Sequence, residues 1–218
     1  MFKKVKSKFD RSNLFGFESV TVKDDEMVQG ALPGNKLHLV TLLSFLALEG
    51  LLLVAHFFFN EFTLAQFAFL SLLALSLARQ IALDFAWHIM LEIYNFPTVI
   101  ASIFVPYYLF NQGSITQSLV CGFAMFMFFL LFTLVASRIA GKSAGIGGAD
   151  IIFAFAIGGF LLPEVIFISI FLSSVLSLII TSFYENKSEV PMGPGLLVSF
   201  WICLLFQEQI LDIFNKLI

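Results

Sequence analysis

Long apolar segments separated by short polar breaks make up most of the chain after its first 36 residues. A helix that crosses the roughly 30 Å hydrocarbon core of a bilayer needs about 20 mainly apolar residues. Seven segments have this apolar character: residues 37–59, 62–83, 93–110, 115–140, 151–162, 164–183 and 195–213. We therefore predict an all-α fold, a polytopic integral membrane helical bundle with about six to seven transmembrane helices.

The segment 151–162 is the exception in length, because it is too short to cross a bilayer as a straight helix. We expect it to be tilted, to begin above the membrane, or to be re-entrant. The segment 195–213 is expected to form one final span.

The first 36 residues are polar and hold seven of the twelve Lys and Arg residues. Basic residues gather in the cytoplasmic segments next to membrane spans. Residues 1–36 are therefore predicted to be a cytoplasmic extension, ahead of a membrane-embedded domain at 37–218. The segment Lys3 to Lys8 either lies on the membrane surface as a basic amphipathic turn or is a solvated tail.

Seven alternating spans would make three further regions cytoplasmic, residues 84–92, 138–150 and 184–194. Four more basic residues lie in or beside these regions, and only Lys216 falls on the other side. This orientation places Asp84 and Asp150 at the same cytoplasmic boundary.

Composition supports lipid as the solvent, since only 12% of residues are charged, against about 25% in soluble domains. The 29 phenylalanines suit a lipid-facing surface. The net charge of −3 and the lack of a basic stripe give no reason to expect a nucleic-acid partner. Cys121 and Cys203 fall in apolar segments and are interpreted as small buried hydrophobes rather than a disulfide or metal pair.

Asp84 and Asp150 are the candidate catalytic residues, because each lies where an apolar segment meets a polar one. Two carboxylates brought close together cannot both ionise cheaply, so one keeps a proton while the other activates water. The glycines before Asp150, which are Gly145, Gly147 and Gly148, are expected to allow unusual backbone torsions and close substrate approach. Asp150 is equally well placed as a helix N-cap. Capping does not explain Asp84, at a helix C-terminus.

Secondary candidates are His88, Glu92 and Glu49. A continuous helix would place Asp84, His88 and Glu92 on one face, as a metal site or, more commonly, as a hydrogen-bonded strip. We predict no metal. Glu49 lies within the first span, as a functional carboxylate or a protonated packing residue. The tryptophans and tyrosines, Trp201 among them, are interpreted as anchors at the membrane interface.

Three separated stretches resemble one known family. They are GGADIIFAFAIGG at 147–159, EVPMGPGLLVSF at 189–200 and ALDFAWHIMLEIYNFP at 82–97. Together they resemble the type 4 prepilin peptidases, GxGD-type aspartic membrane proteases, in the short form without the cysteine and zinc domain. The resemblance implies that Asp84 and Asp150 are catalytic.

The same resemblance implies that the loops before two helices shape the substrate site, through Gly147, Gly148, Ala149, Gly193 and Pro194. It further implies cleavage of a leader from a prepilin-like (type IV pilin or pseudopilin) protein. The site and the N-terminus would face the cytoplasm from the inner membrane. No cofactor is expected, because the domain associated with N-methylation is missing.

Three positions depart from the family pattern: Ala149 replaces a glycine, Ile152 a lysine and Leu91 a proline. The loss of the lysine and of the proline favours, as an alternative, a non-catalytic homologue that acts as an assembly factor in a pilus or secretion system, whereas Ala149 resembles the GxAD form of archaeal preflagellin peptidases. A small transporter with Glu49, Asp84 and Asp150 as a proton path is a third reading.

Overall fold

The computed structural model describes residues 34–87, 92–140, 147–182 and 193–217. In these four ranges the secondary structure is entirely α-helical, which confirms the all-α prediction. The helices are α1 (Gly34–Phe58), α2 (Leu64–Trp87), α3 (Glu92–Tyr108), α4 (Ile115–Ala140), α5 (Gly148–Phe160), α6 (Pro163–Ser182), α7 (Gly193–Leu205) and α8 (Gln207–Leu217). The predicted extension at 1–36 falls almost wholly outside the described residues.

Four of the described helices, α1, α2, α4 and α6, are long and apolar enough to cross a membrane. The bent pair α7 and α8 makes a fifth if it counts as one span. The chain is therefore an integral membrane protein with several membrane-spanning helices. Helix α5 has 13 residues, in keeping with the short segment predicted there, and α3 has 17 residues with Pro97 and Pro106 inside it.

The final apolar segment at 195–213 is not one straight helix, because α7 and α8 meet at an angle of 77°. Helix α8 is amphipathic and carries Gln207, Glu208 and Asp212, which a purely apolar environment would penalise. At the bend, the Asn60 side-chain amide donates to the Leu205 carbonyl at 2.8 Å. This bond satisfies a carbonyl that the end of α7 would otherwise leave free.

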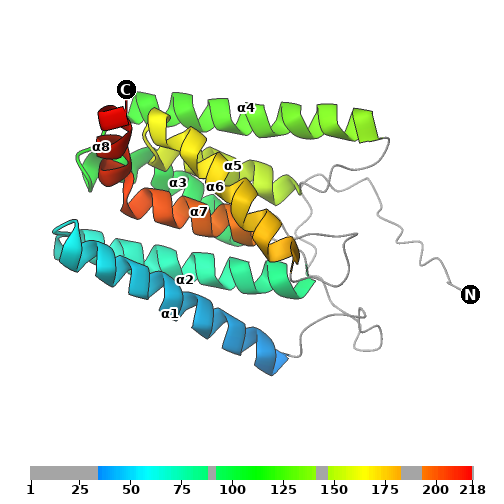
Figure 1. The fold of residues 1–218 in the computed structure, drawn as a ribbon, viewed down its shortest axis with the longest axis horizontal. Helices are drawn as coiled ribbons and strands as arrows, with labels where there is room; N and C mark the ends of the chain where they lie inside the picture. The colour runs from blue at the N-terminus through cyan, green and yellow to red at the C-terminus, as the bar shows by residue number, and fades with distance from the viewer. Residues whose placement is uncertain (1–33, 88–91, 141–146, 183–192, 218) are drawn as a thin grey trace, which may run out of the picture. The chain divides into compact units, whose positions relative to one another are not determined.

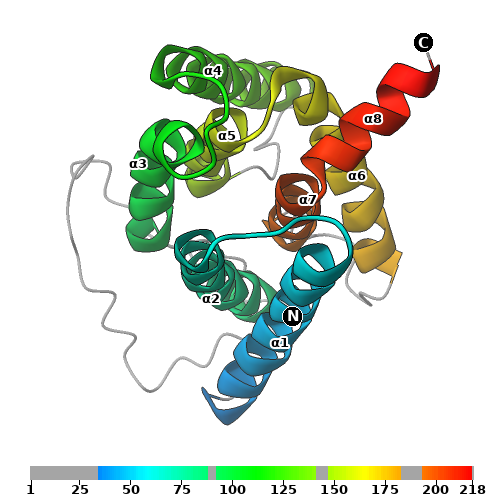
Figure 2. The ribbon, with the colours of Figure 1, turned by 90° about the vertical axis from the view of Figure 1, so that its left-hand side faces the viewer.

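The short helices α5 and α7 lie inside the bundle. Helix α5 packs against α3 and α4, and α7 packs against α6 and α2, with α1 alongside α2 (Figures 1 and 2). Eight of the 13 residues of α5 and eleven of the 13 residues of α7 are buried. Because neighbouring helices shield them, these two helices need not match the thickness of the bilayer.

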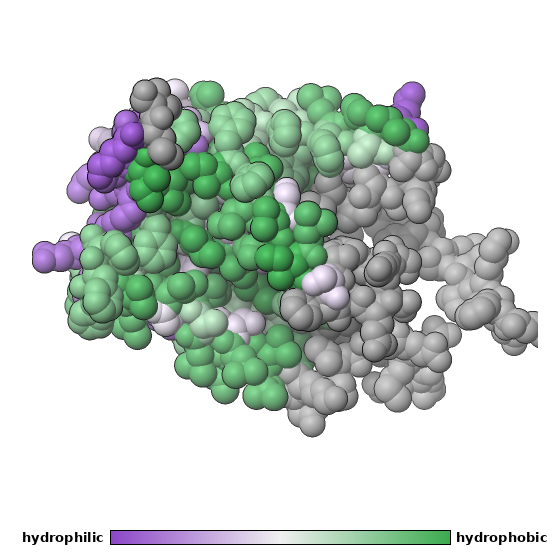
Figure 3. All heavy atoms as spheres, viewed as in Figure 1, coloured by the Kyte–Doolittle hydropathy of each residue, from purple (hydrophilic) through white to green (hydrophobic). Residues whose placement is uncertain are grey.

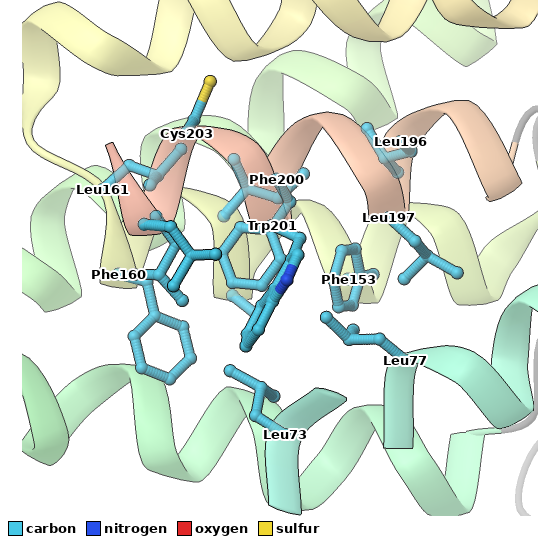
Figure 4. Close-up of a cluster of buried hydrophobic side chains, with 14 of the residues drawn as sticks. Leu73, Leu77, Phe153, Phe160, Leu161, Leu196, Leu197, Phe200, Trp201 and Cys203 are labelled. Atoms are coloured by element: carbon cyan, nitrogen blue, oxygen red, sulfur yellow. The ribbon is translucent and has the colours of Figure 1, made fainter. Parts of the chain in front are cut away.

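The core is built where α7 meets α2 and α5. Figure 4 shows Trp201 of α7 directed toward Leu73 and Leu77 of α2, with Phe153 of α5 close by. Trp201 is completely buried, and its indole N–H donates to the Leu48 carbonyl at 3.0 Å. The prediction of Trp201 as an interface anchor is therefore wrong, because the indole N–H finds a protein acceptor in the core.

Large apolar side chains cover the outside of the bundle. Phe167 and Phe171 of α6 are 76% and 71% exposed, and similar side chains project from α1 and α4. In Figure 3 hydrophobic residues cover the side of the bundle, and hydrophilic residues gather at the end that carries α8. This distribution is the one expected of a lipid-facing belt, to which Phe167 and Phe171 contribute.

Candidate functional site

The end of α2 and the starts of α3 and α5 lie at one end of the bundle. Helices α2 and α3 run in opposite directions, since Gln66 at the start of α2 donates to the Leu109 carbonyl after α3, at 2.8 Å. Near the start of α3, the Asn95 side-chain amide donates to the Ala149 carbonyl at the start of α5, at 3.0 Å. Figure 1 shows the start of α7 at this same end.

Asp84 lies in the last turn of α2 and is only 6% exposed. Its carboxyl interacts electrostatically with Asp150, and the backbone N–H of Gly193, at the start of α7, donates to it. Among the described residues its Oδ2 atom has no hydrogen-bond partner. A buried carboxylate beside a second carboxylate is costly, so packing alone gives no reason for it.

Asp150 lies in the first turn of α5 and is partly buried. Its Oδ2 accepts a hydrogen bond from the Gly147 backbone N–H at 2.9 Å. Gly147 is the N-cap, so the predicted placement of Asp150 as the N-cap is wrong by three positions. Asp150 instead reaches back to the cap residue, as the third helical residue of a capping box does. It therefore has a structural role in addition to its interaction with Asp84.

The residues expected to shape the site adopt ordinary conformations. The N-cap Gly147 has φ −76°, and among the described glycines a positive φ occurs at Gly113, not at Gly147 or Gly148. The expectation of unusual torsions at these two glycines is therefore wrong, and Gly145 lies outside the described residues. Gly193 and Pro194 are buried at the start of α7, where a proline fits the first helical turn without losing a hydrogen bond.

Two of the secondary candidates cannot be placed beside the pair. His88, like Leu91, lies outside the described residues, and of Glu92 only the backbone position at the start of α3 is described. Because α2 and α3 are antiparallel, Asp84 and Glu92 do not share one face of a straight continuous helix. The predicted strip over 84–92 therefore has no support in the described residues.

Glu49 is remote from the pair. It accepts a hydrogen bond from the Ser71 hydroxyl of α2 at 3.3 Å, and its Oε1 is buried without a partner among the described residues. Ser71 precedes Asp84 by 13 residues, which is about 20 Å along a helix. The Ser71 contact fits the packing reading of Glu49 and does not connect Glu49 to Asp84.

Metal-ligating side chains do not cluster in the described part of the chain. There, no three His, Cys, Asp or Glu side chains come together in a way that could hold a metal ion. Cys121 and Cys203 are free, and Cys203 is fully buried, as predicted for a small buried hydrophobe, whereas Cys121 is only partly buried.

Sequence reasoning missed two buried amides at this end. Gln80 and Asn95 are both 0% exposed, and neither amide atom of Gln80 has a hydrogen-bond partner among the described residues. Gln80 precedes Asp84 by one helical turn, so the i to i+4 spacing was the available signal. Asn95 lies in the 82–97 stretch that carries part of the resemblance.

The candidate site is a pair of carboxyls at one end of an integral membrane helical bundle, next to the N-terminus of a buried helix. No protein family, curated protein or solved structure matches the chain. The functional argument therefore rests on the chemistry of this site and on the three short stretches of sequence.

Proposed function

We propose that this protein is a membrane aspartic endopeptidase that cleaves the leader peptide of prepilin-like proteins. The observation that carries the proposal is the electrostatic interaction of Asp84 with Asp150 at one end of the bundle, beside the Gly193 N–H. Each of these three residues belongs to a different one of the stretches that resemble the prepilin peptidases, and the stretches are far apart in sequence. Their convergence is what a shared site requires.

The chemistry follows from two carboxyls that share one proton. The ionised carboxylate takes a proton from water as the oxygen attacks the peptide carbonyl, and the protonated carboxyl donates to that carbonyl oxygen. The carboxyl that took the proton from water then donates that proton to the leaving amine, and no covalent enzyme intermediate forms. Asp84 and Asp150 each accept one backbone N–H, from Gly193 and Gly147 respectively, so these hydrogen bonds do not distinguish the base from the acid.

The proposed topology has about six to seven membrane segments, with α3 and α5 counted among them, in the inner membrane. Arg79 lies in α2 shortly before Asp84, and Arg138 lies in the last turn of α4. Both are toward the end of the bundle that holds Asp84 and Asp150. Basic residues favour the cytoplasmic side, so the N-terminus and the site are assigned to the cytoplasm. A prepilin-like substrate presents its basic leader there while its hydrophobic helix stays in the bilayer.

The direct test co-expresses the full chain with a prepilin-like substrate in cells without their own prepilin peptidase. Mass spectrometry of the substrate N-terminus should show removal of the leader. A substrate that stays uncut with well-inserted protein would contradict the proposal.

A second candidate is a non-catalytic assembly factor, and the hydrogen bond from Gly147 to Asp150 favours it. That bond gives Asp150 a structural role that does not require catalysis. This candidate predicts that the protein leaves the substrate uncut and still co-purifies with pilus or secretion components.

Asn95 provides a prediction about how the site is held. Asn95→Leu removes the donor to the Ala149 carbonyl, which should destabilise the fold by about 1–3 kcal/mol and reduce leader cleavage, because the start of α5 is no longer anchored. Thermal unfolding in detergent and the cleavage assay measure the two effects. Thr98→Val is the matched control, since the buried Thr98 hydroxyl donates to the Tyr94 carbonyl of its own helix and to no other helix among the described residues. Equal loss of cleavage in both variants would contradict a specific role for Asn95.

A further inference from the structure

Helix α8 has a polar side and an apolar side. An α-helix turns by about 100° per residue, which places the charged residues Glu208, Asp212 and Lys216 on one side of α8. The opposite side carries branched apolar and aromatic residues, namely Ile210, Leu211, Ile213 and Phe214. With 11 residues, α8 is too short to cross a bilayer by itself, and its charged side would be costly in the hydrocarbon core.

The first turn of α8 is fastened to two of the connections between longer helices. The Gln207 side-chain amide donates at 2.6 Å to the side-chain oxygen of Gln112, which lies between α3 and α4. The Gln209 amide donates at 3.2 Å to the side-chain oxygen of Asn60, which lies between α1 and α2. These two bonds fix the position of α8 along the bundle. Beyond them, every residue from Asp212 to Lys216 is exposed.

Two tyrosines mark the level of the membrane interface at this end of the bundle. Tyr107 and Tyr108 are the last residues of α3 and are 45% and 68% exposed. Tyrosine side chains are enriched where the hydrocarbon core meets the headgroups. Gln112 follows Tyr108 by four residues and is bonded to Gln207. Helix α8 therefore begins near the level of the headgroups.

The bend directs α8 away from the bundle. Helix α7 runs along the bundle, and α8 meets it at 77°, so α8 runs nearly at right angles to the neighbouring spans (Figure 1). Figure 2 shows α8 extending outward from the end of α7 and past α6. A helix that starts at headgroup level and runs in this direction lies in the plane of the interface.

The apolar side of α8 is turned toward the membrane. Ile210 and Leu211 are partly buried and pack against the hydrophobic core, so this side of the helix points back to the bundle. Ile213 and Phe214 continue the same side beyond the edge of the bundle and are 60% and 41% exposed. They adjoin the apolar surface of α6, where Phe167 lies in the second turn from this end.

We propose that α8 is an interfacial lipid-binding helix, with Ile213 and Phe214 inserted at the boundary between headgroups and acyl chains. Its charged side faces water. Lys216 forms an ion pair with Asp212 at 2.6 Å and is the one basic residue in the sequence of α8. Binding therefore rests on apolar insertion and not on the charge of the headgroup. This role does not depend on the proposed protease activity.

The test measures the depth of single spin labels on the full-length protein in phosphatidylcholine vesicles, with Cys121 and Cys203 replaced by alanine. Labels on Ile213→Cys and Phe214→Cys should lie about 5–10 Å below the headgroups and collide more with oxygen than with a water-soluble nickel chelate. The label on Asp212→Cys, on the opposite side of α8, should collide more with the chelate. All three positions are exposed, so the labels should leave the fold intact. Adding phosphatidylglycerol should not change the depths.

Four results would overturn the proposal. Equal access of the chelate to the labels at 212, 213 and 214 would place α8 in water. Protection of the labels at 213 and 214 from both reagents would show that a protein surface, such as a second copy of the chain, covers them. A steady change in depth from 208 to 216 would make α8 part of a span. Insertion only with phosphatidylglycerol would show that headgroup charge drives binding.

A pair of variants separates apolar insertion from an effect of added charge. Phe214→Asp should bring the label at position 213 out of the bilayer, because an ionised carboxylate on the apolar side is costly in lipid. Asn215→Asp adds the same charge one residue further on, at an exposed position beside the charged residues, and should leave the label in place. Equal displacement of the label by both variants would contradict the insertion of Phe214.

Discussion

Asp84→Asn is expected to reduce leader cleavage by at least about 100-fold, because the pair then lacks one of the two groups that move protons. Asp150→Asn is expected to have an effect of the same size. An asparagine oxygen at position 150 can still accept the Gly147 N–H, so the start of α5 keeps its hydrogen bond. Cleavage of a co-expressed prepilin-like substrate, measured by mass spectrometry with membrane levels of each variant, checks both losses.

The control is Asp212→Asn, which changes an exposed carboxylate in α8 at the opposite end of the bundle. This variant should cleave normally. Normal cleavage by both Asp84→Asn and Asp150→Asn would reject the two-aspartate mechanism. A variant of Asp150 that loses stability together with activity would instead point to its capping role.

Gly158→Ala is expected to give the largest loss of stability, about 3 kcal/mol or more. A Cβ atom at Gly158 would lie 2.3 Å from the Cys121 carbonyl oxygen and 2.7 Å from its carbon. These are backbone atoms of α4, so no side chain can rotate away and α4 and α5 must separate. Thermal or denaturant unfolding in detergent measures the effect.

Gly50→Ala is the matched control for this change. Gly50 lies within α1, and a Cβ atom there meets nothing within 4 Å. Alanine is a better helix former than glycine, so Gly50→Ala should be neutral or slightly stabilising. A neutral Gly158→Ala would contradict the close packing of α4 against α5.

Most of the helices could be predicted from the apolar pattern, and the reason is physical. A backbone in lipid must satisfy its own hydrogen bonds, so long apolar segments form helices that end where polar residues begin. The segment 115–140 coincides with α4. The α7–α8 bend could not be predicted from apolar content alone, since it depends on Asn60 reaching the Leu205 carbonyl from another part of the chain. The burial of Trp201 likewise depends on Leu48, a residue distant in sequence.

The candidate site could be predicted in part. Alternating helix directions bring the end of α2 and the start of α5 to the same end, so a common location for Asp84 and Asp150 follows from counting segments. The distance between the carboxyls and the Gly193 N–H depends on helix packing, which the sequence pattern does not contain. Gln80 and Asn95 were missed because a buried amide within an apolar segment has no distinct pattern. The capping register of Asp150 was missed because it depends on where α5 begins.

The proximity of the two aspartates is tested most directly by thiol cross-linking in membranes. The protein carries D84C and D150C, with Cys121 and Cys203 replaced by alanine, and a protease site inserted after Gly113 separates the two new thiols in the chain. A short bifunctional methanethiosulfonate reagent should hold the two fragments together after proteolysis, and the D84C and E164C pair, which spans the length of the bundle, should not. If D84C and D150C fragments separate as completely as those of the D84C and E164C pair, the two carboxyls do not share a site.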